Sequence, residues 1–154
     1  MQWAQCQKDF KFDGLWIDIY ILNTDRADWN RFLRSLLNSK YPIAFWIDGE
    51  IAKPITTIQE ALNIGNYANP LMHIDVFRVH VACHFFTDKE IELDIDPREV
   101  NSQQDLDRVV DFMMFLGNCL QKKVILTPEN SPHLIIIEFD PKTQAICYYQ
   151  VDNF

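Results

Sequence analysis

Residues 76–96, VFRVHVACHFFTDKEIELDID, decide the fold because apolar residues fall on every second position in two successive arms. A period of two is the pattern of strands with one buried face. The polar residues between the arms are typical of a turn. The sequence therefore predicts a hairpin at the centre of a sheet. Its buried set is Phe77, Val79, Val81, Cys83 and Phe85 in the first arm and Ile91, Leu93 and Ile95 in the second.

The intervening residues of the hairpin predict a second face of different character. Successive strand side chains point to opposite sides of a sheet, so each residue between two buried ones should point away from the core. One face of the hairpin should therefore be apolar, and the other should carry four carboxylates. The outward set is Arg78, His80, Ala82, His84 and Phe86 in the first arm and Glu90, Glu92, Asp94 and Asp96 in the second.

The rest of the chain alternates between strand and helix patterns. Apolar alternation or short apolar runs predict strands at 15–22, 43–47, 124–126, 134–139 and 145–149. Capping residues followed by apolar residues at three- and four-residue spacing predict helices at 25–37, 57–62 and 102–120. The order β-α-β-α-β-β-α-β-β-β favours an α+β fold with one mixed, largely antiparallel sheet and helices packed on one side. We expect residues 1–154 to form a single globular domain.

Composition and charge narrow the classes of partner. The net charge is −8 and the sequence pI about 4.8, so binding to nucleic acid or to an anionic membrane surface is not expected, because both need clustered Lys and Arg. The start of the chain shows no apolar segment of signal-peptide length, and no later run reaches the ~18 apolar residues of a membrane span. These features predict a cytoplasmic protein. The widely spaced Cys6, Cys83, Cys119 and Cys147 are then expected to be free, mostly buried thiols.

The sequence predicts no catalytic residue, metal site or cofactor. His80 and His84 have the spacing of two helical zinc ligands, but on a strand they lie about 13 Å apart. Cys83 and His84 are neighbours on a strand and point to opposite faces, so they do not form a nucleophile–base pair. Nucleotide-binding, metalloprotease and serine-hydrolase motifs are absent from the sequence, and no small-molecule ligand is expected.

The strongest anomaly is acidic: residues 88–111 contain nine carboxylates against three basic side chains. One interpretation is an ordinary solvated surface. A second is electrostatic steering of a basic partner, and a third is protection of a sheet edge against pairing with another chain. On the second interpretation, the candidate partner-binding residues are Asp88, Glu90, Glu92, Asp94, Asp96 and Glu129.

Residues 112–117 (FMMFLG) and 123–130 (KVILTPEN) resemble immunity proteins of bacterial polymorphic toxin systems, including contact-dependent growth inhibition. The resemblance covers about residues 106–139. It implies a small cytoplasmic protein that binds and blocks the carboxyl-terminal domain of a cognate toxin. An acidic surface would suit a basic nuclease toxin, because carboxylates imitate the phosphates that such an enzyme binds. Two alternatives remain open: a small cytoplasmic enzyme that uses His80, His84 or Cys83, and an oligomerising regulatory domain.

Overall fold

The computed structural model describes residues 1–150, which build one sheet of nine strands. The strand order is β3-β2-β4-β5-β6-β1-β7-β8-β9, and every pairing is antiparallel. The predicted α+β class is confirmed, with a purely antiparallel sheet in place of a mixed one. The strands are β1 (Ile17–Leu22), β2 (Ile43–Ile47), β3 (Glu50–Ala52), β4 (Pro70–Val76), β5 (Val79–His84), β6 (Glu90–Ile95), β7 (Val124–Pro128), β8 (Ile137–Asp140) and β9 (Ala145–Tyr148).

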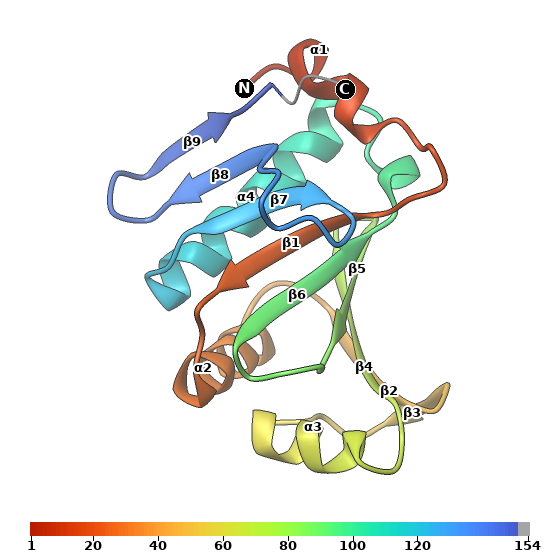
Figure 1. The fold of residues 1–154 in the computed structure, drawn as a ribbon. Helices are drawn as coiled ribbons and strands as arrows, with labels where there is room; N and C mark the ends of the chain where they lie inside the picture. Colours follow the sequence, from red (N-terminus) through yellow and green to blue (C-terminus); the bar gives the residue numbers. More distant parts are fainter. Residues whose placement is uncertain (151–154) are drawn as a thin grey trace.

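The two long helices lie on one side of this sheet. In Figure 1, α4 passes behind β1, β7 and β8, and α2, which packs against α4, lies next to the end of β1; the sheet thus has a covered face toward α4 and an open face toward the viewer. None of the helices in residues 1–150 is long and apolar enough to cross a membrane. The helices are α1 (Trp3–Cys6), α2 (Arg26–Leu37), α3 (Ile58–Gly65) and α4 (Gln103–Leu120), with short 3₁₀ turns η1 (Gln7–Phe10) and η2 (Pro97–Glu99).

Side-chain caps fix where the three longer helices begin, as the sequence predicted. The side chain of Asp25 accepts a hydrogen bond from a backbone amide in the first turn of α2, and Thr57 and Ser102 do the same for α3 and α4. The N···O distances are 2.8, 3.2 and 3.1 Å. Each cap pairs an amide that the helix itself leaves without a partner, and such a cap stabilises a helix by about 1 kcal/mol.

The core lies between the helices and the covered face. Ile19 of β1 and Leu93 of β6 are fully buried, as are Phe112 and Met113 of α4. Helix α4 lies close to the sheet at Gly117. A Cβ atom there would lie 2.5 Å from a ring carbon of Phe139 on β8. The absence of a side chain at this position therefore allows α4 to pack directly against the sheet.

The predicted central hairpin is present, but its first arm begins at Val79 and not at Phe77. Strands β5 and β6 pair in the middle of the sheet, with Cys83 opposite Leu93. Phe77 does not belong to β5. It forms a two-residue turn with Arg78, both at positive φ (49° and 85°), and 46% of its surface is exposed. This turn connects β5 to β4 (Pro70–Val76), a strand that the sequence pattern did not predict.

Three further differences concern elements near the sheet edges and the chain start. The three-residue edge strand β3 was not predicted, nor were α1 and η1. Strand β8 begins at Ile137, three residues later than expected. The strand predicted at residues 15–22 is present as β1, which lies inside the sheet between β6 and β7.

Candidate functional site

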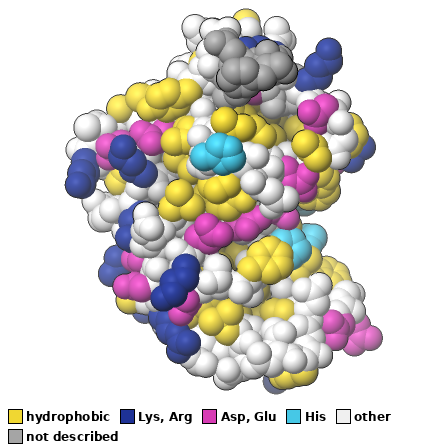
Figure 2. Space-filling model, viewed as in Figure 1, with side chains coloured by type: hydrophobic (Ala, Val, Ile, Leu, Met, Phe, Trp, Pro, Cys, Tyr) yellow, Lys and Arg dark blue, Asp and Glu magenta, His cyan; other side chains and the backbone are white. Residues whose placement is uncertain are grey.

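The open face carries predicted carboxylates at its centre, and the strand register places them beside β1. Glu90, Glu92 and Asp94 alternate along β6 with buried residues of the covered face. In the antiparallel pairing, Glu92 lies opposite Tyr20, and Asp94 lies opposite Asp18. Figure 2 shows the same side of the molecule as Figure 1, with acidic side chains in a band across the middle. The sheet therefore gathers carboxylates from two strands that are far apart in the sequence.

Asp18, Glu92 and Asp94 form a compact group, which we call the acidic cluster. Carboxylate oxygens of the three residues lie within 4.8 Å of one another. Asp18 is only 1% exposed, and its Oδ2 accepts hydrogen bonds from the Asn130 amide at 2.7 Å and from the Tyr20 hydroxyl at 3.1 Å. The segment that follows β7 therefore lies over part of the open face and shields Asp18 from water.

The acidic cluster is electrostatically unfavourable. Burial raises the pKa of Asp18 to about 7, and the negative charges of Asp94 and Glu92 add to this rise against the effect of the two hydrogen bonds. Burial is also the main cause of the raised pKa of Glu92, and the negative charges of Asp94 and Glu90 raise it further. Both carboxyl groups are therefore harder to ionise in the folded protein, first because they are removed from water and second because neighbouring negative charges repel them.

His84 is the positively ionisable group bonded to this cluster. Its Nε2 lies 3.2 Å from a carboxylate oxygen of Asp94, and this hydrogen bond raises the pKa of the imidazole. The ring of His84 also stacks on Phe86, with centroids 5.1 Å apart and an interplanar angle of 10°. His84 therefore connects the acidic cluster to an aromatic side chain that is 68% exposed.

The alternative enzyme residues are placed as the strand pattern predicts. Cys83 is fully buried, and burial raises its pKa well above the ordinary value, whereas its neighbour His84 bonds to Asp94 on the open face. His80 has a different carboxylate partner, Glu99, at 2.9 Å from its Nδ1. These contacts bring neither a thiol to an imidazole nor the two imidazoles to one site.

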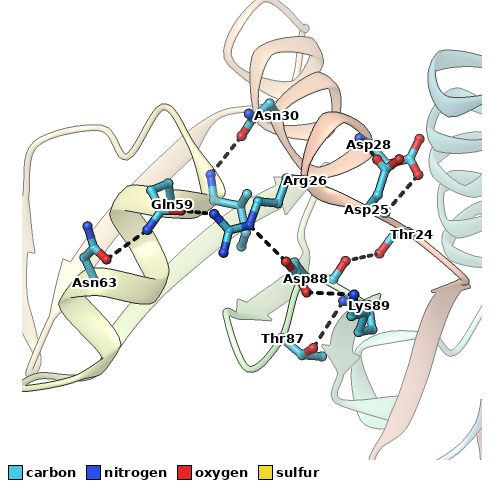
Figure 3. A network of polar contacts seen from close by, with 11 residues as sticks. Thr24, Asp25, Arg26, Asp28, Asn30, Gln59, Asn63, Thr87, Asp88 and Lys89 are labelled. Carbon is cyan, nitrogen blue, oxygen red and sulfur yellow. Dashed lines mark hydrogen bonds and ion pairs between the residues drawn. The ribbon is translucent and has the colours of Figure 1, made fainter.

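Asp88 has a structural environment of its own, away from the acidic cluster. Its carboxylate forms an ion pair with Arg26, the first residue of α2, whose Nε lies 3.1 Å from Oδ2. Figure 3 shows how the two side chains point toward each other. Arg26 also donates to Gln59 of α3, and the Thr24 hydroxyl donates to the Asp88 carbonyl at 2.8 Å. The Asp88 contacts thus tie the β5–β6 loop to the starts of α2 and α3. The structure gives this predicted partner-binding residue a role in joining elements.

The two remaining candidates also lie apart from the cluster. Asp96 caps the turn η2 and forms a 2.8 Å ion pair with Arg98. Glu129 accepts a 3.4 Å hydrogen bond from the Trp16 amide. The edge-protection interpretation is wrong for this acidic strand, because β6 pairs with β5 on one side and β1 on the other.

The sequence did not predict the apolar part of the open face. Strand pairing places Ile51 of β3 opposite Trp46 of β2, Trp46 opposite Leu71 of β4, and Leu71 opposite His84 of β5. We call Ile51, Trp46, Leu71 and the adjoining Phe86 the apolar row. Ile51 is 75% exposed, and Trp46 and Leu71 are partly exposed. Beside the row, Trp46 and His73 border a hollow of about 250 Å³.

The signal for this apolar row was present only in part. Phe86 was assigned to the outward face, and the alternation in β2 also turns Trp46 away from the core side. The remaining information is the neighbour relation between β2, β3 and β4, which pattern alone does not give. Only the register of β2, β3 and β4 shows that these separate apolar residues form one surface.

The acidic cluster is the group of residues within 1–150 whose ligand atoms are close enough to hold a metal ion. Exposed acidic groups commonly gather without an ion, so we assign none to it. Compared with protein-family models, curated proteins and solved structures, the chain gives no match. The resemblance of residues 112–117 and 123–130 to immunity proteins therefore stays a prediction.

Proposed function

We propose that this chain is an immunity-type protein that binds and neutralises a cognate toxin domain through the open face of its sheet. The observation that carries the proposal is the acidic cluster, together with Glu90, at the centre of that face. The resemblance of residues 112–117 and 123–130 to immunity proteins supplies the class of partner. We place its action in the cytoplasm, where the free thiols of all four cysteines remain reduced.

The negative charge at this site is largely uncompensated within the fold. Of these four carboxylates, only Asp94 forms an ion pair within residues 1–150, and its partner is His84. Asp88 and Asp96, in contrast, are paired with arginines. Burial is the main cause of the raised pKa of Asp18 and Glu92, and repulsion between the carboxylates adds to it; a basic side chain from a partner would relieve that repulsion. The folded protein therefore gains more from a partner's cation at this cluster than at the paired carboxylates.

A toxin that cleaves nucleic acid is the partner that this surface suits best. Such an enzyme carries a basic groove for phosphates, and carboxylates held by a rigid sheet occupy that groove with little loss of freedom. The opposed fields also accelerate encounter between inhibitor and toxin. Neutralisation then consists of covering the groove, and the inhibitor needs no catalytic group of its own.

The test uses the carboxyl-terminal domain of a large secreted protein encoded beside this chain as the probe. We expect the double variant Glu90→Lys/Glu92→Lys to associate with this domain at least tenfold more slowly than wild type at low salt. The Glu92→Lys change removes one of the carboxylates that repel Asp18, so the fold should tolerate this substitution. Stopped-flow association and inhibition of the domain's nuclease activity measure the effect.

The matched control is Asp107→Lys/Asp111→Lys, which makes the same change in net charge on exposed positions of α4. This helix lies on the opposite side of the sheet (Figure 1). We expect the control to slow association only slightly, through the overall charge. Equal slowing by both variants would show that net charge acts without a defined site, and absence of wild-type binding would refute the proposed function.

A further inference from the structure

We infer that the apolar row anchors the partner, while the neighbouring carboxylates select it by charge. The occupant is a basic protein surface with an exposed apolar side chain among its Lys and Arg residues. This inference rests on the proposed function and adds the contact that sets the lifetime of the complex.

The apolar row is a continuous surface. Hydrogen-bonded neighbouring strands lie about 4.8 Å apart, so Ile51, Trp46 and Leu71 follow one another directly across β3, β2 and β4. The row ends beside His84, whose ring carries Phe86. Two members, Ile51 and Phe86, are more than two-thirds exposed. Apolar side chains gathered in this way indicate an interaction site, whereas single exposed ones are common on any protein.

Charge identifies what occupies the row. His84 stacks on Phe86 and bonds to Asp94 at 3.2 Å, so the apolar row and the acidic cluster are parts of one surface. In Figure 2 an apolar ring lies directly beside a histidine and the acidic band. A second copy of this chain would bring its own carboxylates against these, and an anionic membrane would be repelled. A basic protein complements both parts.

The two parts of the surface should act on different steps of binding. Charges near an interface mainly raise the association rate, whereas buried aromatic anchors mainly set the dissociation rate. Phe86 suits the second role because its stack on His84 holds the ring in place before binding. A side chain ordered in advance loses less conformational freedom when the complex forms.

The experiment compares Ile51→Ala/Phe86→Ala with Leu37→Ala/Tyr67→Ala. The control removes an aliphatic and an aromatic side chain that are also exposed, at 39% and 80%, but lie on α2 and in the turn after α3. The probe is again the neighbouring toxin domain. Circular dichroism and urea midpoints confirm that both variants fold.

We expect the apolar-row variant to dissociate more than about tenfold faster than wild type, with an association rate within about twofold. The control should match wild type in both rates. Unchanged dissociation of the apolar-row variant, with wild-type binding intact, would overturn this inference and leave the proposed function standing. No binding by wild type would overturn both.

Discussion

The two faces of strand β6 show how one segment serves the fold and a surface separately. Its covered-face residues Ile91, Leu93 and Ile95 are fully buried, whereas Glu92 and Asp94 on the open face are partly exposed and close to the buried Asp18. The covered face gains stability from burial of apolar area. The open face loses stability where its carboxylates repel one another. A local conflict of this kind is expected where a surface is adapted to bind a partner.

The largest expected effect concerns the covered face. Leu93→Ala leaves a cavity in a fully buried position of a central strand, and such changes lower the free energy of unfolding by about 2–5 kcal/mol. Glu90→Ala, on the same strand but the open face, should change it by less than about 0.5 kcal/mol. Urea unfolding followed by circular dichroism measures both. Similar losses in the two variants would contradict the division between the faces.

The second prediction concerns the pH dependence of stability at Asp18. Its pKa is raised from 3.8 to about 7 in the folded protein. The folded state therefore binds more protons than the unfolded state between about pH 4 and pH 7, and this residue's contribution to stability falls as pH rises through that window. Over the whole window, the pKa shift lowers the contribution of Asp18 to the free energy of unfolding by roughly 4 kcal/mol. Asp18→Asn removes the titration, so its stability relative to wild type should increase steadily from pH 4 to pH 7.

The measurement is urea unfolding of both proteins at a series of pH values. Asparagine keeps an oxygen that accepts the Asn130 amide, and its NH₂ group can donate to the neighbouring carboxylates. Asp107→Asn, at an exposed position on α4, is the matched control and should show no such trend. A constant difference between Asp18→Asn and wild type across the series would refute the prediction.

The fold was largely predictable from the sequence because most strands and caps are local patterns. The β4–β5 turn was missed for a local reason as well. Phe77-Arg78 contains no Gly, Asn or Asp, the residues that usually mark a two-residue hairpin turn. Phe77 also stands in phase with the buried residues Val79 and Val81, so the pattern assigned it to the strand. A turn that shifts the phase without its usual residues gives no sign in the sequence.

The candidate site was predictable only in part, for a different reason. Strand alternation placed Glu90, Glu92 and Asp94 on one side correctly. It gave no information on which strand lies beside them, so Asp18, more than 70 residues earlier in the chain, was not included. The arginine partners of Asp88 and Asp96 likewise follow from loop geometry. Register and loop contacts depend on the whole fold, which a single-sequence pattern does not specify.

The smallest effect that we predict lies at the boundary between the acidic cluster and the apolar row. The hydrogen bond to Asp94 raises the pKa of His84 above its ordinary value of 6.5. The ion pair therefore stabilises the fold fully below about pH 6.5, and the contribution is lost as pH rises through the higher folded-state pKa. For this partly exposed pair we expect about 0.5–1 kcal/mol.

His84→Gln tests this effect, because glutamine can still donate to Asp94 but carries no charge. Both proteins should also contain Asp18→Asn, so that the Asp18 titration does not overlap with that of the histidine. On the neighbouring strands, His73 of β4 and Glu92 of β6 also face this group. We expect the glutamine variant to be less stable than its parent at pH 5.5 and equal to it at pH 8.5. A loss of equal size at both pH values would mean that His84 acts through its stacking on Phe86 rather than through its charge.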